Sequence, residues 1–306
     1  MSDKPDAQSR TILWCVPRSV STALARCLSA IEDNQIWFEP FCYCYFAQVE
    51  FEQITGRKLP KDIRGNEQTF LEASDILQKL TASNFRPDFI SYPSIKRMLE
   101  EADSPHVFVK DIPNGYLDEL RFLPRGYRHA FLIRHPLRTI SSFRTSVFHQ
   151  LLDQGKLDGE AANEATFDIV KHNPYYASGF HFKEVHTIWK FVRENMDRSP
   201  IVIDGDDLLA NPADLLPKFC RAVGLPYDER LLTFDPSIES LNSWVTGADD
   251  MLMNFVNFYK TAMTTTQFIP AKEMPRRDQM TPDVIRCVDE AMPFYSEMYE
   301  TRIKLS

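Results

Sequence analysis

Residues 10–39, RTILWCVPRSVSTALARCLSAIEDNQIWFE, decide the fold of this chain. They begin with an apolar run over 11–16 and continue through a polar turn over 17–22. An amphipathic segment over 23–31 then repeats its apolar residues with a helical period, and a second apolar run over 36–38 ends at an acidic residue. This order predicts a buried strand, a turn rich in hydroxyl groups, a helix and a second strand.

The turn between the first strand and the helix has the features of an anion-binding site. The first backbone N–H groups of a helix have no partner within the helix, and the helix dipole places partial positive charge beside them. Arg18 adds a fixed positive charge, and Ser19, Ser21 and Thr22 add hydroxyl groups. The turn therefore indicates an enzyme that handles phosphate or sulfate groups.

The length and composition predict one large globular domain. The chain has 306 residues, of which 43% are hydrophobic, and this content supports a substantial core. A net charge of −8 argues against a nucleic-acid partner. The polar first ten residues predict a disordered tail without a signal peptide, followed by a single domain over 11–306.

Two further features of the sequence bear on cellular location. No run of apolar residues is long enough for a transmembrane helix. The six cysteines lack the dense spacing of a secreted disulfide scaffold, so we expect reduced thiols. These features predict a cytoplasmic protein without a membrane partner.

Apolar runs and helical segments alternate along the chain, which favours an α/β fold with a central parallel sheet flanked by helices. We expect buried strands over 12–16, 106–110, 129–133 and 201–203. Caps and periodicity predict helices over about 22–31, 94–102, 136–150, 179–196, 212–224 and 282–302. The stretches 41–95, 151–178 and 240–280 fit the sheet poorly, and we interpret them as insertions that either complete the core or form walls of a substrate pocket.

Several familiar phosphate motifs are missing from the sequence. None of the 10 glycines forms a Gly-x-Gly pair, so the dinucleotide fingerprint does not occur. Gly-Lys-Ser/Thr does not occur either, which argues against a nucleotide kinase of the usual type. The histidines show no metal-ligand spacing, and we expect no metal.

Three segments resemble the sulfotransferases that use 3′-phosphoadenosine 5′-phosphosulfate (PAPS). The turn 17–22, PRSVST, is similar to their 5′-phosphosulfate loop, and 127–143 is similar to their 3′-phosphate segment, a strand that ends in arginine with a serine eight positions later. Residues 201–214 resemble their strand followed by an acidic "(E/D)DL…NP" passage, and 219–226 resemble the next helix and its Gly-Leu-Pro turn. The resemblance is closer to tyrosylprotein, carbohydrate and bacterial members than to the cytosolic steroid and phenol type.

This resemblance implies a three-layer P-loop-like fold and a role for PAPS as donor, with the bisphosphate PAP as product. It implies transfer of the sulfuryl group to a hydroxyl or amine of a small-molecule acceptor by in-line displacement. The residues it assigns to the donor are Arg18, Ser19, Val20, Ser21, Thr22, Ala23, Arg134 and Ser142. Arg138 lies four residues before Ser142 on one helix face, so Arg138 joins or flanks the same site.

The general base has two candidates. Glu39 matches the position of the proposed glutamate base in tyrosylprotein and carbohydrate sulfotransferases, and its apolar neighbours suit a carboxylate that accepts a proton near neutral pH. Asp111 is the second candidate, beside Lys110, which could bridge donor and acceptor oxygens. Arg18 would stabilise the leaving phosphate.

The sequence departs from the resembling family at three places. Val20 stands where glycine is common, so we expect Val20 to avoid positive φ. Ala23 stands where cytosolic members often have tryptophan, so adenine stacking must come from elsewhere. The C-terminal Arg-Lys-Gly signature is missing, and Arg276-Arg277 is the nearest basic pair.

Two alternative functions stay open at this point. The chain could bind PAP or PAPS without catalysis, although the retained arginines and Glu39 argue against this. A P-loop-like kinase is the other alternative, and the missing Gly-Lys-Ser/Thr argues against it.

Overall fold

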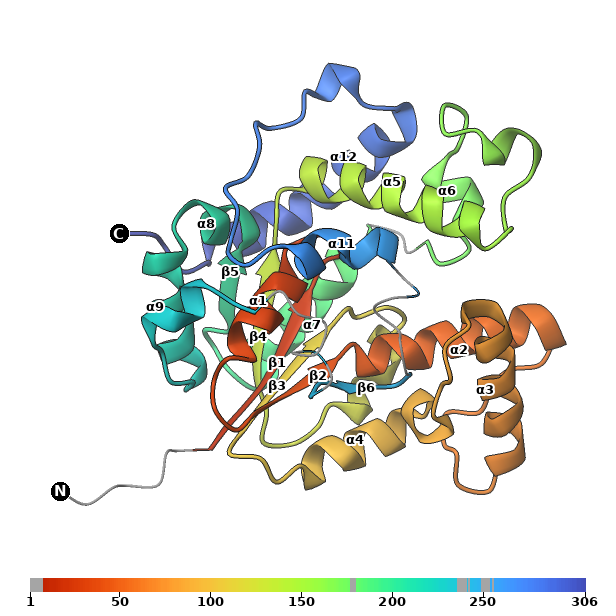
Figure 1. The fold of residues 1–306 in the computed structure, drawn as a ribbon, viewed down its shortest axis with the longest axis horizontal. Helices are drawn as coiled ribbons and strands as arrows, with labels where there is room; N and C mark the ends of the chain where they lie inside the picture. Colours follow the sequence, from red (N-terminus) through yellow and green to blue (C-terminus); the bar gives the residue numbers. More distant parts are fainter. Residues whose placement is uncertain (1–7, 177–179, 236–240, 242, 249–253, 255) are drawn as a thin grey trace.

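A computed structural model describes residues 8–176, 180–235, 241, 243–248, 254 and 256–306. Its centre is a six-stranded sheet with every pairing parallel, in the order β5-β4-β1-β3-β2-β6 (Figure 1). The strands are β1 (Ser9–Cys15), β2 (Asn34–Phe38), β3 (His106–Asp111), β4 (Arg128–Ile133), β5 (Ile201–Asp204) and β6 (Val245–Thr246). The predicted α/β class with a central parallel sheet is confirmed.

Strand β1 lies in the middle of the sheet and pairs with β3 on one side and β4 on the other. Its register places Trp14 beside Asp111 of β3 and beside Phe131 of β4. The direction in which successive strands are added reverses at β1. In open α/β sheets such a reversal leaves a crevice at the carboxyl ends of the strands, where ligands bind.

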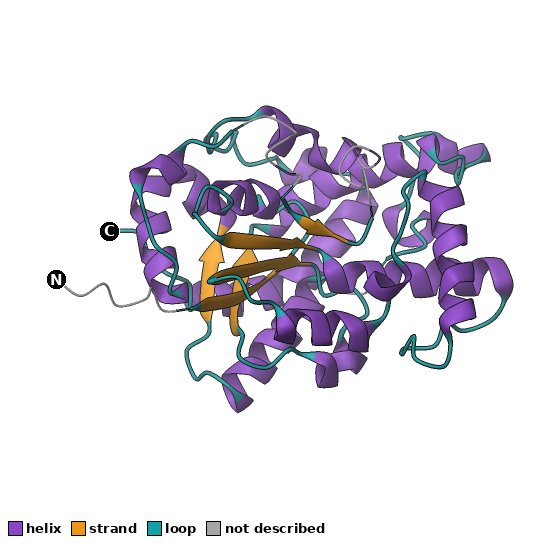
Figure 2. Cartoon of the chain, turned by 60° about the horizontal axis from the view of Figure 1, so that its bottom comes forward, coloured by secondary structure: helices purple, strands orange, loops and turns teal. Residues whose placement is uncertain are grey.

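Helices cover both faces of this sheet (Figure 2). The side chains of β1 alternate between the faces, as a strand buried on both sides requires. Ile12 and Trp14 pack in one core with α4, α7 and α12, whereas Leu13 and Cys15 pack in a second core with α1, α8 and α9. The helices are α1 (Ser21–Leu28), α2 (Pro40–Thr55), α3 (Glu67–Thr81), α4 (Tyr92–Glu101), α5 (Pro136–Asp153), α6 (Ile169–His172), α7 (Phe182–Asn195), α8 (Gly205–Ala210), α9 (Pro212–Val223), α11 (Val256–Thr264) and α12 (Pro282–Glu300).

The predicted helix near 212–224 follows its sequence signals closely. Asn211 caps α9 by accepting a hydrogen bond from the Asp214 N–H, Pro212 opens the helix, and Gly224 ends it with φ 77°. Glycine adopts this left-handed conformation at little energetic cost, because it has no Cβ. The prediction is confirmed here because the cap, the first turn and the C-terminal glycine are all local features of the sequence.

Other predicted boundaries need correction. Strand β1 begins at Ser9, so Ser9 and Arg10 belong to the strand rather than to a tail. Residue 179, the predicted start of a helix, lies outside the described residues, and α7 begins at Phe182. The two-residue strand β6, inside the stretch interpreted as an insertion, was not predicted because it is too short to show a period.

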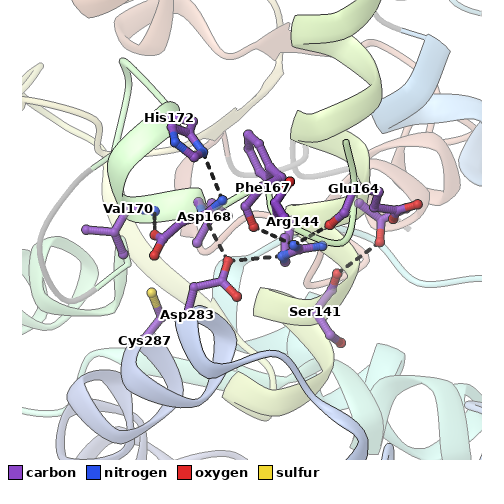
Figure 3. A network of polar contacts seen from close by, with 12 residues as sticks. Ser141, Arg144, Glu164, Phe167, Asp168, Val170, His172, Asp283 and Cys287 are labelled. Carbon is purple, nitrogen blue, oxygen red and sulfur yellow. Dashed lines mark hydrogen bonds and ion pairs between the residues drawn. The ribbon is translucent and has the colours of Figure 1, made fainter. Parts of the chain in front are cut away.

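A buried ion pair connects α5 to α12 and to the segment before α6 (Figure 3). Arg144 Nε donates to Asp283 Oδ2 at 3.0 Å, and the same oxygen accepts the N–H of Ile169 at 3.0 Å. Arg144 Nη2 also donates to the carbonyl oxygens of Glu164 and Phe167. Both charged side chains are almost fully buried, so this network fixes α5 relative to α12.

In the part of the chain that the structure describes, no helix is long and apolar enough to cross a membrane. All six cysteines lie within this part, and all are free thiols, as the sequence predicted.

Candidate functional site

A cavity of about 640 Å³ opens at the carboxyl edge of the sheet. The β1–α1 turn, the ends of β2, β3 and β4, and side chains of α5 and α11 contribute to its walls. This is the crevice that the strand order predicts, so the chain brings its anion-binding turn to the expected place.

The β1–α1 turn adopts an unusual backbone conformation. Arg18 has φ 65° and Val20 has φ 70°, both in the left-handed region. The expectation that Val20 avoids positive φ is therefore wrong. A β-branched residue in this region is strained, and strain of this kind persists where the surrounding packing holds the backbone and often marks a functional site.

The hydroxyl groups of the turn do not cap helix α1. Val20 precedes the helix and α1 has no side-chain cap, while Ser19 Oγ donates to the Val16 carbonyl oxygen at 2.7 Å. Ser21 and Thr22 instead line the cavity at the first turn of the helix, where an anion is stabilised by the helix dipole.

The two segments that resemble phosphate sites meet in space. Arg18 Nε donates to Ser142 Oγ of α5 at 3.0 Å, although the residues are 124 positions apart in the chain. The Arg18 Nη1 also donates to the carbonyl oxygen of Phe258 in α11. Burial lowers the pKa of Arg18, and the charge of nearby Arg134 acts in the same direction.

Arg134 and Arg138 converge on one carboxylate, Asp206 at the start of α8. Arg134 Nε lies 2.8 Å from Oδ1, and Arg138 Nε lies 3.1 Å from Oδ2. Gly205, next to Asp206, packs directly against the β1–α1 turn: a Cβ added there would lie 2.6 Å from the Ser19 carbonyl oxygen. Sequence reasoning recognised this passage, 201–214, but did not assign Gly205 or Asp206 to the site.

Glu39 and Lys110 form a buried ion pair at the cavity wall. Lys110 Nζ donates to Glu39 Oε1, and Tyr259 of α11 donates its hydroxyl to Oε2 at 3.0 Å. Glu39 itself has φ 54° and stands directly before α2. Sequence reasoning missed Tyr259, because nothing local links residue 259 to residue 39.

Asp111 is engaged with the backbone. Its carboxylate accepts the N–H groups of Phe41, Cys42 and Ile112 at 2.7, 3.1 and 2.8 Å, so it caps the first turn of α2. Burial raises the pKa of Asp111 to about 8, and the three N–H groups oppose that shift. With both oxygens committed to α2, Asp111 fits a structural role better than that of a general base.

Most of the residues predicted to bind the donor line the cavity, but not all. Ser19 is fully buried beneath the turn, and Arg138 contacts Asp206 and the Glu273 carbonyl oxygen outside the lining. Arg276 and Arg277 are exposed and pair with Asp278 and Asp289. The predicted residues that line the cavity are Arg18, Val20, Ser21, Thr22, Ala23, Glu39, Lys110, Arg134 and Ser142.

The rest of the cavity wall comes mainly from the stretches interpreted as insertions. Thr265 and residues 267–272 belong to this wall, and Phe268 is an aromatic side chain among them that is available for adenine stacking. Aromatic and apolar side chains of α2 and α5, including Phe46, Phe143 and Leu151, line another part. Other side chains of α2 and α3 form a core of their own, so these stretches contribute both to the cavity wall and to the core.

Within the described ranges, no cluster of histidine, cysteine or acidic side chains could hold a metal ion. A cavity that offers guanidinium groups, an ammonium group and a helix N-terminus fits an anionic ligand. The chemistry of these donors suits phosphate and sulfate groups.

A family model described as a sulfotransferase domain matches residues 193–302, the part of the chain that runs from α7 to the end of α12. Over this part of the chain, which includes the segments 201–214 and 219–226, the match confirms the sulfotransferase resemblance, and it supports a sulfotransferase function. The matched part contains Tyr259, which lines the cavity, and Asp206, which pairs with the lining residue Arg134.

Solved structures similar to this chain include three sulfotransferases. The sulfotransferase domain from the curacin biosynthetic pathway is 17% identical with a TM-score of 0.47, covering 98% of this chain and 99% of that one. The domain from the Synechococcus PCC 7002 olefin synthase is 16% identical with a TM-score of 0.38, covering 94% and 96%. The sulfotransferase from Alicyclobacillus acidocaldarius is 13% identical with a TM-score of 0.43, covering 99% and 98%. No curated protein sequence matches the chain.

Proposed function

We propose that this protein transfers a sulfuryl group from PAPS to a hydroxyl or amine of a small-molecule acceptor. The observation that carries the proposal is the hydrogen bond between Arg18 and Ser142. It joins the turn suited to the 5′ end of the donor to the helix suited to its 3′-phosphate. A nucleotide with phosphate groups at both ends needs two such sites in one cavity.

The residues at these two sites fit the two ends of the donor. Arg18, Ser21 and Thr22 lie at the N-terminus of α1, where they can bind the 5′ group. At the other site, Ser142 and the guanidinium groups of Arg134 and Arg138 suit the 3′-phosphate, because planar guanidinium groups bind phosphate in a bidentate manner. PAPS supplies an activated sulfuryl group with PAP as the leaving group.

Glu39 is the general base in this proposal. Both of its oxygens are occupied in the free protein, so one contact must open before Glu39 can accept a proton from the acceptor. Lys110 is the partner better able to move, because its ammonium group ends a flexible stem, whereas Tyr259 is a rigid ring on α11. Arg18 would stabilise the negative charge that develops on the leaving phosphate.

The acceptor would occupy the part of the cavity between α2 and α5. Phe46, Phe143 and Leu151 there suit an apolar or aromatic body, whose reacting hydroxyl must reach Glu39. A cytoplasmic location remains a prediction of the sequence.

Thermal unfolding with PAP, PAPS and Mg-ATP tests the proposal. A ligand at about 100 times its dissociation constant adds roughly 2.7 kcal/mol of stability, which raises the melting temperature by several degrees. We expect PAP and PAPS to raise it and Mg-ATP to leave it unchanged. No rise with PAP, or a rise with Mg-ATP alone, would contradict the proposal.

A further inference from the structure

Asp206 holds the two guanidinium groups that the proposed function assigns to the 3′-phosphate. Its carboxylate lies 2.8 Å from Arg134 Nε and 3.1 Å from Arg138 Nε, one oxygen for each arginine. The three side chains keep 24%, 16% and 14% of their surface exposed, respectively. These three side chains are therefore only partly exposed to solvent. Their charges interact more strongly than they would in bulk water.

The backbone fixes Asp206 at this position. Its N–H donates to Asp204 Oδ1 at 2.8 Å, so the first turn of α8 is capped. Gly205 is packed against the Ser19 carbonyl oxygen and the Arg134 side chain, which leaves no room for a Cβ. The Asp206 carboxylate is therefore held in the first turn of α8, which packs against the β1–α1 turn.

The two arginines are held to different degrees. Arg134 donates through Nε to Asp206 and through Nη1 to the Arg18 carbonyl oxygen at 3.3 Å. Arg138 forms an ion pair with Asp206 that lacks the alignment of a hydrogen bond, and Nη1 donates to the Glu273 carbonyl oxygen at 3.1 Å. Arg138 is therefore the partner that can turn toward a ligand at lower cost.

The net charge of Arg134, Arg138 and Asp206 is too small to neutralise a phosphate group. A phosphate monoester carries about −1.5 to −2 charges near pH 7, whereas two arginines with one aspartate carry a net charge of +1. A 3′-phosphate bound by Arg134 and Arg138 would lie close to the Asp206 carboxylate, and two like charges at short range repel. Removal of the aspartate charge would leave both positive charges for the phosphate.

We propose that Asp206 is a built-in counter-ion that weakens binding of the 3′-phosphate and so sets the affinity for PAP and PAPS. This inference rests on the proposed function. The product keeps the 3′-phosphate of the donor, so a site without Asp206 would also hold the product more tightly. Asp206 then favours product release at the expense of tight donor binding, and it acts on nucleotides that carry a 3′-phosphate.

Calorimetric titration tests this inference without an acceptor. The ligands are PAP and 5′-AMP, which differ by the 3′-phosphate, and the proteins are wild type, Asp206→Asn and Asp207→Asn. Asparagine keeps an oxygen for Arg134 Nε and removes the charge. Asp207→Asn is the matched control, because Asp207 is the adjacent residue, undergoes the same change of charge, and pairs with Arg302 instead, at 2.7 Å.

We expect Asp206→Asn to bind PAP on the order of tenfold more tightly than wild type, which corresponds to about 1.4 kcal/mol. The affinity for 5′-AMP should stay within about twofold in both variants, and Asp207→Asn should leave PAP affinity unchanged. Weaker or unchanged PAP binding by Asp206→Asn would overturn the inference, since Asp206 would then only orient the arginines. If Asp206→Asn does not fold, Asp206→Ser takes its place with the same expectation. Failure of wild type to bind PAP at all would instead overturn the proposed function.

Discussion

At the scale of single residues, the charged side chains of the site are already engaged in ion pairs and hydrogen bonds with one another in the protein without ligand. Glu39 meets Lys110 and Tyr259, and Arg134 meets Asp206. The sequence shows which charged residues stand at or near the end of each predicted strand. It does not show which of them pair with one another. These pairings depend on the register of neighbouring strands, as when Phe38 of β2 stands beside Lys110 of β3.

Substitution of the proposed base gives the sharpest prediction at this scale. We expect Glu39→Gln to lower turnover by about 100-fold or more, because a positioned general base contributes roughly that factor. Gln can still accept the Tyr259 hydrogen bond, whereas Lys110 loses its buried counter-ion, so the variant should also be less stable. Turnover of labelled PAPS with a panel of aromatic and aliphatic alcohols measures the first effect.

A matched comparison separates catalysis from folding in this variant. PAP binding by Glu39→Gln should stay within a few-fold of wild type, which shows that the donor site has formed. Asp111→Asn is the comparison for the base itself. If Asp111→Asn binds PAP but loses turnover while Glu39→Gln stays active, the base is Asp111 and our assignment is wrong.

At the scale of helices and strands, the site is held by contacts that fix α2 and α5. Asp111 caps α2, and Arg144 ties α5 to Asp283 of α12. The strands and most helices could be predicted because they carry local signals: apolar runs, prolines at first turns and capping residues. The roles of Asp111 and Arg144 could not be predicted from the sequence. Their partners Phe41 and Asp283 lie 70 and 139 positions away along the chain.

The ion pair between α5 and α12 should contribute strongly to stability (Figure 3). We expect Asp283→Asn to lower the free energy of unfolding by about 3–5 kcal/mol, because it leaves the buried Arg144 charge without a counter-ion. Denaturant unfolding measures this change. Asp289→Asn, on the exposed side of α12 and paired with the exposed Arg277, is the control and should cost less than about 1 kcal/mol. Equal effects of the two substitutions would contradict this role of Asp283.

At the scale of the whole molecule, the strand order determines where the site lies. The reversal at β1 opens the cavity at the carboxyl edge, and the segments 17–22, 127–143 and 201–214 all reach that edge because each follows or contains a strand of one parallel sheet. The alternation of apolar runs and helical segments along the sequence was enough to predict the fold class. Residues 240–280 were interpreted as either core or pocket wall, but helix α11 within them was not predicted, because they show no period that links them to the sheet.

His129, a buried histidine of strand β4, makes the stability of the fold depend on pH. Burial lowers the pKa of His129 to about 4, and its Nδ1 accepts the Trp14 indole N–H at 3.0 Å. In the unfolded chain histidine binds a proton near pH 6.5, so the unfolded state holds more protons between pH 6.5 and 4, and stability falls as the pH is lowered through this window. We expect this histidine to account for a loss of about 2 kcal/mol between pH 7.5 and pH 5.0.

Denaturant unfolding of wild type and His129→Gln at these two pH values checks the effect. The variant should lose less stability than wild type on acidification, whatever its stability at pH 7.5. An equal loss in both proteins would show that His129 does not titrate in this way.

The measurement that tests the central claim most directly is calorimetric binding of PAP to wild type, Arg134→Ala and Ser142→Ala. The account predicts that wild type binds PAP, that it binds 5′-AMP more weakly, and that both substitutions weaken PAP binding by about tenfold or more while 5′-AMP binding changes little. Absence of PAP binding by wild type, or PAP binding that neither substitution weakens, would contradict the account.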